Sequence, residues 1–175
     1  MKVFCENLGP MHTPLTDDFP SNTAPPPLLP MARLVCEVGA VVSLGGPAKH
    51  GERRYVPILS GSVRGPELNG ELVQGGVDWQ VQRADGVTEI SAHYVIRCAD
   101  DALIEVQSDG LRHGPPELMA RLARGEPVPA QDYFFRTLMR LTTGHPDWLH
   151  LNKLMALANG RRERSRVTLD IWRIG

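Results

Sequence analysis

Short runs of alternating apolar and polar residues, each closed by glycine, proline or aspartate, recur from residue 32 to the end of the chain. The clearest run has a small or apolar side chain at every second position, namely Ala32, Leu34, Cys36, Val38, Ala40 and Val42. A period of two residues is typical of a β-strand that buries one face. Short strands with close turns and no long helix favour an antiparallel sheet, closed into a barrel or folded as a sandwich.

Turn residues set the expected ends of these strands. We expect strands at residues 32–42, 55–59, 69–73, 77–83, 89–98, 102–107, 133–142 and 167–174. Asp85-Gly86 and Asp109-Gly110 each follow one of these runs, and Asp-Gly steps between alternating runs are strong hairpin signals. One short helix is expected from Pro115, with Gly125 as its stop. Residues 110–114 are then a polar bend before the helix.

The segment Ser21–Pro30 carries four prolines, which exclude a helix and disfavour a central strand. We therefore divide the chain into an irregular proline-rich N-terminal arm at residues 1–30 and a β-barrel domain at residues 31–175. The arm is expected to pack on the domain or on a partner subunit. A homodimer is expected, because twofold dimers are the commonest assembly.

Composition excludes several classes of partner. The formal net charge is −1, so no overall field draws the chain onto nucleic acid or an anionic membrane. The basic run at residues 161–164 is interpreted as a solvated hairpin tip, since no aromatic residues interleave with it. No apolar run approaches the ~20 residues that span a bilayer, and the N-terminus lacks a signal-peptide core, so a cytoplasmic location is expected.

The cysteines and histidines do not form a recognisable ligand set. Three cysteines are far apart and form no Cys-x-x-Cys pair, which argues against a disulfide scaffold and a structural zinc site. Six histidines are scattered, and no His-x-His occurs. We expect neither a metal nor a cofactor.

The densest candidate for chemistry is the run Gly-Gly-Val-Asp-Trp at residues 75–79. Asp78 and Trp79 are adjacent, so regular pleating points them to opposite faces and only one can line a lumen. A desolvated aspartate would have a raised pKa, as suits a general acid or base, whereas the alternative is a solvent-facing Asp78 beside a core tryptophan. Tyr94 lies on a face that looks interior, where its hydroxyl would meet a substrate oxygen or only pack.

Further candidates lie later in the chain. His113 titrates near neutral pH if it is free, although a lone loop histidine is more often solvated. Arg136 follows three aromatic residues, including Phe134, and would clamp a carboxylate or enolate oxygen or pair with an acidic neighbour. Glu105 belongs to a polar row that is either the solvent side of the barrel or the wet wall of a lumen.

The order of these pieces resembles a known family. Gly61 and Gly65 in a strand turn are followed by the residue 75–79 run, the Tyr94 strand, Asp109-Gly110-Leu-Arg, Tyr-Phe-Phe-Arg and a Trp148 to Asn152 segment. From about Leu34 to the C-terminus this resembles the uncharacterised family called domain of unknown function 3237. The resemblance implies a small antiparallel, calycin-like β-barrel, with Asp78, Trp79, Tyr94, Arg136, Trp148 and Asn152 as pocket or framework positions.

Two features depart from that family. After Tyr-Phe-Phe-Arg the family usually has an acidic residue following an aromatic one, but this chain reads Arg-Leu-Thr-Thr at residues 140–143. The proline-rich arm is also an addition.

The leading functional hypothesis is a cofactor-independent isomerase, cyclase or lyase. It would move a proton on an oxygenated, mostly apolar metabolite, with Asp78 as acid or base and Tyr94 and Arg136 on a developing oxyanion. His113 is a second acid or base, and the residues expected to bind the substrate are Trp79, Glu105, Phe134, Trp148 and Asn152. The alternatives are a non-catalytic small-molecule carrier or sensor, and a structural homo-oligomeric module.

Overall fold

The computed structural model describes residues 24–46 and 51–175, and most of the expected arm lies outside these ranges. The strands are β1 Leu28–Val38, β2 Val42–Ser43, β3 Glu52–Arg64, β4 Gly70–Leu72, β5 Gly76–Gln82, β6 Thr88–Arg97, β7 Leu103–His113, β8 Phe134–Thr142, β9 Met155–Arg162 and β10 Arg166–Ile174. The helices are α1 Pro116–Ala123 and the 3-10 segments η1 Ala130–Asp132 and η2 Pro146–Lys153.

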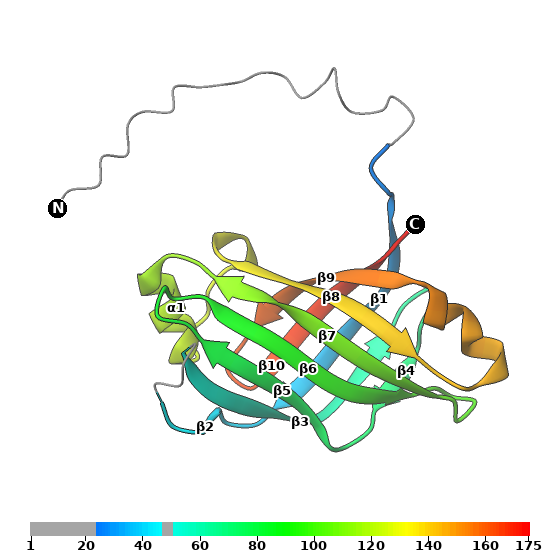
Figure 1. The fold of residues 1–175 in the computed structure, drawn as a ribbon, viewed down its shortest axis with the longest axis horizontal. Coiled ribbons are helices and arrows are strands. Elements are labelled where there is room, and N and C mark those ends of the chain that lie inside the picture. The colour runs from blue at the N-terminus through cyan, green and yellow to red at the C-terminus, as the bar shows by residue number, and fades with distance from the viewer. Residues whose placement is uncertain (1–23, 47–50) are drawn as a thin grey trace.

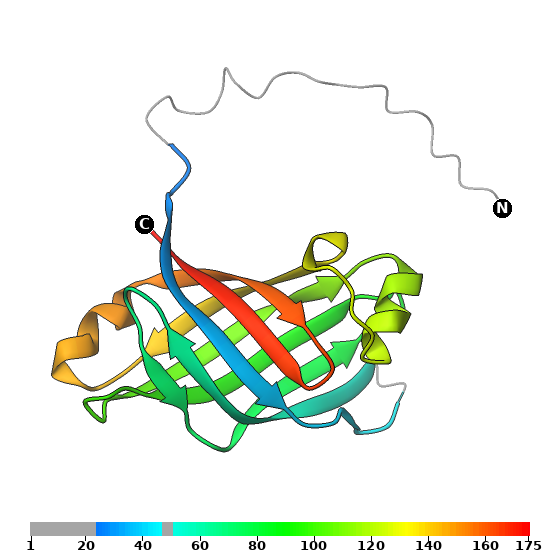
Figure 2. The ribbon, with the colours of Figure 1, turned by 180° about the vertical axis from the view of Figure 1, so that it is seen from behind.

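The strands form one closed antiparallel β-barrel with eight positions around its circumference, as Figures 1 and 2 show. Each strand from β6 to β10 pairs with the next, and β10 pairs with β1. The pairing of β1 with β3 closes the barrel, and β4 and β5 share the position between β3 and β6. Closure leaves the main strands without open edges. The expected all-β barrel fold is thereby confirmed.

Several strands differ in length from the sequence expectation. β1 starts at Leu28, three residues inside the expected arm, and β3 extends far beyond residues 55–59 on both sides. β9 is not among the expected strands. The most consequential difference is β7, which continues through Asp109-Gly110 to His113 instead of turning there.

Gly110 explains why that Asp-Gly step is not a turn. An added Cβ at Gly110 would lie 2.0 Å from the backbone oxygen of Arg136, so glycine is required for the close approach of β7 to β8. Glycine, which in the sequence indicated a turn, is needed at this position because the neighbouring strand packs too closely for a side chain. The predicted bend at residues 110–114 is therefore wrong, and its first four residues belong to a strand.

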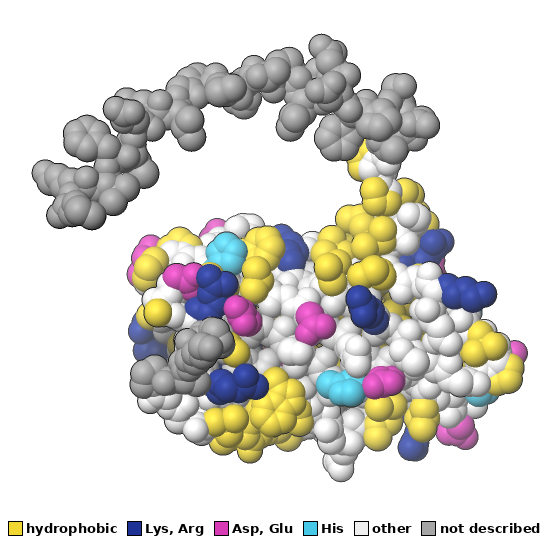
Figure 3. Space-filling view, in the orientation of Figure 1, with side chains coloured by type: hydrophobic (Ala, Val, Ile, Leu, Met, Phe, Trp, Pro, Cys, Tyr) yellow, Lys and Arg dark blue, Asp and Glu magenta, His cyan; other side chains and the backbone are white. Residues whose placement is uncertain are grey.

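The two ends of the barrel differ. At the end where η2 lies, large apolar side chains fill the interior, and Met31, Leu68, Ile96, Ile104 and Leu151 are almost fully buried. At the opposite end α1 lies beside the strand ends (Figure 1). A cavity lined partly by α1 lies at this end. Leu138 and Leu111 are exposed on the outer wall. On the face drawn in Figure 3, hydrophobic side chains lie among polar and charged groups.

The helices are short. None within the described residues is long and apolar enough to cross a membrane.

A basic cavity at the open end of the barrel

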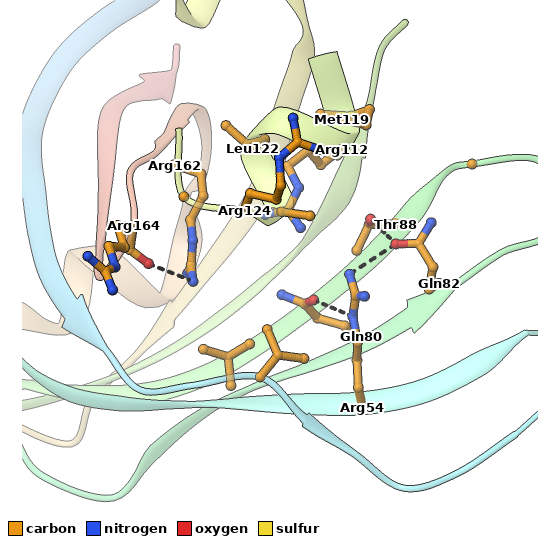
Figure 4. A pocket seen from close by; sticks show the side chains of 15 residues that line it. Arg54, Gln80, Gln82, Thr88, Arg112, Met119, Leu122, Arg124, Arg162 and Arg164 are labelled. Carbon is orange, nitrogen blue, oxygen red and sulfur yellow. Dashed lines mark hydrogen bonds between the residues drawn. The ribbon is translucent and has the colours of Figure 1, made fainter. Parts of the chain in front are cut away.

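A cavity of about 460 Å³ occupies the open end of the barrel. Its walls come from β3, β5, β6, β7, β9, α1 and the adjoining loops, and Figure 4 shows their side chains converging on one space. The lining residues are Val41, Arg54, Val56, Gln80, Gln82, Gly86, Thr88, Arg112, Met119, Leu122, Ala123, Arg124, Gly125, Arg162 and Arg164. The volume is within the roughly 300–1,000 Å³ of small-molecule sites.

Strand register directs three arginines into this cavity. Arg54 pairs with Gln80 across β3 and β5, and Arg112 pairs with Thr88 across β7 and β6. Arg162 lies opposite Val167 on β10. Directly opposed residues share a face of an antiparallel sheet, so each arginine follows its partner into the lumen.

Arg54 is fixed by two glutamines. Its Nε donates to Gln80 Oε1 and its Nη2 donates to Gln82 Oε1, both at 3.0 Å. The Thr88 hydroxyl also donates to Gln82 Oε1, at 2.8 Å. The guanidinium is thereby held in place by neutral hydrogen-bond partners, while the negative charges of Glu52 and Asp78 act on it without forming an ion pair within 4.0 Å.

Asp78 lies just below this network, on the inner face of β5 opposite Ala92. Gln80 Nε2 donates to its Oδ2 at 2.6 Å, whereas its buried Oδ1 has no hydrogen-bond partner within residues 24–46 and 51–175. Burial raises the pKa of Asp78 above that of an ordinary aspartate, although the Gln80 bond and the charges of Arg112, Arg162 and Arg54 oppose the shift. A carboxylate with a raised pKa and one free oxygen is suited to exchange a proton.

A narrower space of about 40 Å³ continues the cavity inward, past Asp78. Its walls are mainly apolar and include Tyr94, which is only 4% exposed. The buried Tyr94 hydroxyl has no hydrogen-bond partner among the described residues. Burial raises the pKa of Tyr94, with smaller contributions from Cys36 and Asp78, so the phenol is a neutral donor at physiological pH. Burial also raises the pKa of Cys36 to about 11, so that side chain is a thiol.

Arg112 and Arg162 face Asp78 without pairing with it. Both line the outer cavity and the inner space, yet no ion pair within 4.0 Å joins either one to Asp78. Across the described part of the chain, Arg112 makes no side-chain hydrogen bond, and Arg162 makes only a 3.4 Å bond to the Arg164 oxygen. The Arg112 guanidinium lies 5.7 Å from the centre of the Phe135 ring.

Burial, together with the positive charges of Arg162 and Arg54, lowers the pKa of Arg112 to about 10. Burial likewise lowers the pKa of Arg162. At neutral pH Arg112 still carries its charge, so the cavity holds cationic donors that no acidic side chain of the described residues pairs with. Their chemistry fits an anionic or strongly polarised oxygen. No group of three His, Cys, Asp or Glu side chains placed to hold a metal occurs within the described residues.

The structure brings two of the predicted site residues into the lumen, Asp78 and Tyr94. Trp79 points outward, is 44% exposed and packs on Tyr55 with ring centres 5.4 Å apart. Of these two adjacent residues, Asp78 therefore faces the lumen and Trp79 faces outward. Glu105 is on the outer wall, where its Oε1 is 2.5 Å from His93 Nε2.

The other predicted site residues lie away from the cavity. His113 stacks on Phe134 outside the barrel, with ring centres 4.8 Å apart, and the Arg136 guanidinium lies 5.4 Å from that same ring. Trp148 and Asn152 belong to η2 at the filled end. Trp148 Nε1 donates to Asp100 at 2.7 Å, and Asn152 bonds the backbone of Thr143, so both hold connecting loops in this structure.

Sequence reasoning misses the three inward arginines. It puts Arg112 in the bend that is really the end of β7, and it makes Arg162 part of a solvated hairpin tip. Arg54 precedes the expected start of its strand. The signal that could have found Arg112 is its spacing of four residues from Ser108, because an even spacing keeps both on the inner face once the strand is known to continue.

The chain is similar to a family of proteins of unknown function and to several solved structures. The model of the family described as "Protein of unknown function (DUF3237)" matches residues 26–174. A UPF0311 protein of Rhodopseudomonas palustris is 35% identical over 141 residues, covering 81% of this chain and 92% of that protein. The crystal structure of an R. palustris protein of unknown function has a TM-score of 0.83 at 33% identity, covering 87% of this chain and all of the other.

Two further solved structures share the fold. A β-barrel-like protein of Acinetobacter baumannii has a TM-score of 0.77 at 32% identity, covering 89% of this chain and 100% of that one. A structure described as an enzyme from Penicillium herquei has a TM-score of 0.66 at 19% identity, covering 90% of this chain and 100% of that one. The last of these shows likeness of fold alone.

Proposed function

We propose that this chain, which belongs to the DUF3237 family of proteins of unknown function, is a cofactor-independent enzyme that moves a proton on a small oxygenated metabolite. The observation that carries the proposal is the unpaired Oδ1 of Asp78, which lines the small inner space together with two arginines that have no acidic partner within 4.0 Å in the described structure. A substrate bound between Asp78 and these two arginines would supply the partners that their polar groups lack.

Asp78 is the proton-transfer group in this proposal. Its Oδ2 is held by Gln80, so Oδ1 is the oxygen that faces the ligand. Burial raises its pKa above that of an ordinary aspartate, which makes the ionised carboxylate a stronger base than an exposed one.

In this proposal Arg112 and Arg162 have the role that we expected for Arg136, which is to stabilise a developing oxyanion. As Asp78 removes a proton next to a carbonyl, the electron pair of the C–H bond becomes a carbon–carbon double bond, and the carbonyl π pair moves onto oxygen. The two guanidinium groups would stabilise that enolate oxygen, and such preorganised stabilisation is usually the largest single contribution to catalysis. In a substrate with a double bond between its β- and γ-carbons, the enolate is a dienolate, and return of the proton from Asp78 to the γ-carbon moves the double bond and gives an isomer, with no net oxidation or reduction.

Tyr94 is the second donor. Its hydroxyl lines the inner space with Asp78 and has no hydrogen-bond partner among the described residues, so it is available to a substrate oxygen. Because its pKa is raised, it would donate a hydrogen bond and keep its proton.

The size and lining of the cavity disfavour the two alternative functions, a structural module and a non-catalytic carrier. A purely structural barrel would be filled along its length, but this one is open over about 460 Å³. A carrier for apolar molecules needs neither a buried carboxylate nor unpaired arginines, which are costly to desolvate. The P. herquei neighbour contributes no residue assignment at 19% identity.

The test uses exchange of carbon-bound hydrogen, which can be followed without identifying the product. Enolisable ketones and β-dicarbonyl compounds would be screened by thermal shift, and those that bind would be incubated with protein in deuterium oxide and followed by proton NMR. We expect exchange with the wild type and its loss, by about 100-fold or more, in Asp78→Asn. Asp109→Asn on the outer wall is the control. Equal exchange by Asp78→Asn and wild type would contradict the proposal.

A further inference from the structure

We infer that the physiological ligand is a small apolar carboxylate, whose charged group binds between Arg112 and Arg162 while its apolar body lies against α1 and β3. The inference rests on the proposed function and deepens it, because it identifies the group next to the moving proton as the carboxylate itself. Arg112 and Arg162 bind the carboxylate oxygens before the proton moves and stabilise the enediolate charge that develops on those same oxygens.

The charges around the cavity support an anionic ligand. Five arginines line it, namely Arg54, Arg112, Arg124, Arg162 and Arg164, and no aspartate or glutamate lies among its lining residues. Arg124 pairs with Glu126, and Arg54 is bound to amide oxygens. Arg112 and Arg162 are the inner pair, and neither has an acidic partner within 4.0 Å inside residues 24–46 and 51–175. Two partly buried guanidiniums in one cavity repel each other unless an anion lies between them.

The chemistry of the walls supports an apolar body. Met119, Leu122 and Ala123 of α1 line one side of the cavity, and Val41 and Val56 line another part of it. Figure 4 shows Met119 and Leu122 beside Arg112, and Arg162 reaches into the same space. A ligand in this space would contact carbon from α1, Val41 and Val56, and its charged group could reach Arg112 and Arg162, the two arginines that also line the inner space.

Asp78 favours a singly charged head over a doubly charged one. It faces the inner arginine pair from the lumen, and its carboxylate repels any anion that those arginines bind. A dianion such as a phosphate monoester suffers that repulsion twice, whereas a carboxylate suffers it once and still matches the planar donor array of an arginine.

The first experiment compares three probes with one apolar body, using isothermal titration calorimetry on the full chain at neutral pH. These probes are 2-naphthoate, the neutral 2-naphthamide and 2-naphthyl phosphate. We expect 2-naphthoate to bind about 10-fold or more tightly than the amide, and more tightly than the phosphate. Equal affinity for acid and amide would overturn the inference, and tighter binding of the phosphate would overturn its carboxylate assignment.

The second experiment places the charge effect at the inner pair. Arg112→Gln and Arg162→Gln should each reduce the preference for 2-naphthoate over 2-naphthamide by about 10-fold. Arg161→Gln is the matched control, because Arg161 is the exposed neighbour of Arg162 on β9 and lines a different, outer hollow. An Arg161→Gln loss equal to that of Arg162→Gln would show a general surface effect and overturn the assignment.

These results separate the inference from the proposed function. If Asp78→Asn binds 2-naphthoate at least as tightly as the wild type but the wild type exchanges no carbon-bound hydrogen, the anion site stands and the proton-transfer role fails. If exchange depends on Asp78 but acid and amide bind equally, the proton-transfer role stands and the carboxylate ligand is wrong.

Discussion

The side-chain amide of Gln80 links Asp78 to Arg54. Its nitrogen donates to Asp78 Oδ2 at 2.6 Å, and its oxygen accepts from Arg54 Nε at 3.0 Å. An amide held at both ends cannot rotate, so the orientation of the Asp78 carboxylate is set from β3 across β5. Gln80 is therefore a positioning residue for the group that we propose to move the proton.

Gln80→Leu should raise the pKa of Asp78 further. The hydrogen bond from Gln80 stabilises the charged carboxylate and opposes the effect of burial, so its loss leaves burial less opposed. Carboxyl-carbon NMR titration of labelled aspartate measures the change directly. Gln107→Leu, on the exposed face of β7, is the control. A lower pKa in Gln80→Leu than in the wild type would show that the amide does not stabilise the anion.

Asp78→Asn should change how stability depends on pH. The folded-state pKa of Asp78 lies above the roughly 3.9 of an unfolded aspartate, so the folded wild type binds this proton more tightly. The wild type therefore loses stability as pH rises from about 4 to the raised pKa, and the loss stays constant above it. Because Asp78→Asn lacks this loss, its free energy of unfolding relative to wild type should increase over that window. Urea denaturation across pH tests this, and a relative stability that falls with rising pH would contradict it.

Tyr94→Phe and Tyr133→Phe should have opposite effects on stability. The Tyr94 hydroxyl is buried without a partner in the described structure, so its removal should leave stability unchanged or raise it by about 1 kcal/mol. The Tyr133 hydroxyl accepts from the backbone N–H of Arg162 at 2.9 Å, and its loss should cost about 1–3 kcal/mol. Chemical denaturation compares the pair. A Tyr94→Phe variant as destabilised as Tyr133→Phe would mean that the Tyr94 hydroxyl already has a structural partner.

Gly110→Ala should destabilise the barrel by about 1–3 kcal/mol, in the range of other overpacking substitutions. Its new methyl group would lie 2.0 Å from the backbone oxygen of Arg136, and backbone in mid-sheet cannot move aside. The same change at Gly144, where no atom lies within 4 Å of the added Cβ, is the control and should be nearly neutral. Equal stability of the two variants would show that β7 and β8 separate more easily than the structure indicates.

The sequence was sufficient for the fold class and for the alternation along individual strands, because a period of two is local and survives closure of the barrel. It placed Tyr94 on a face that looked interior and separated Asp78 from Trp79, but it left open which of those two faces inward. The resemblance to the DUF3237 family added the barrel topology, and the family match supports it.

The remaining site residues depended on long-range information. Whether Gly110 turns the chain or stays in the sheet depends on how closely β8 approaches, and that approach is set by residues more than twenty positions later. The inward position of Arg112 depends on the same point, because Arg112 faces the lumen only if β7 continues past Gly110. Arg136 and Phe134 were expected at the pocket because an arginine beside three aromatic residues could clamp a carboxylate or enolate oxygen, but the β7 to β8 register turns both outward. Trp148 and Asn152 lie at the other end because η2 follows a full crossing of the barrel by β8.

Buried apolar side chains fill the interior at the η2 end, whereas the cavity lies at the end beside α1. A molecule that reaches Asp78 must therefore leave by the route it entered. In the proposed enzyme, substrate and product would share one opening lined by arginines, so a product that keeps the substrate's negative charge should be a competitive inhibitor, whereas a product that has lost it should dissociate quickly. In an enzyme of this shape, charge at the rim would govern how fast the site empties as well as how tightly it fills.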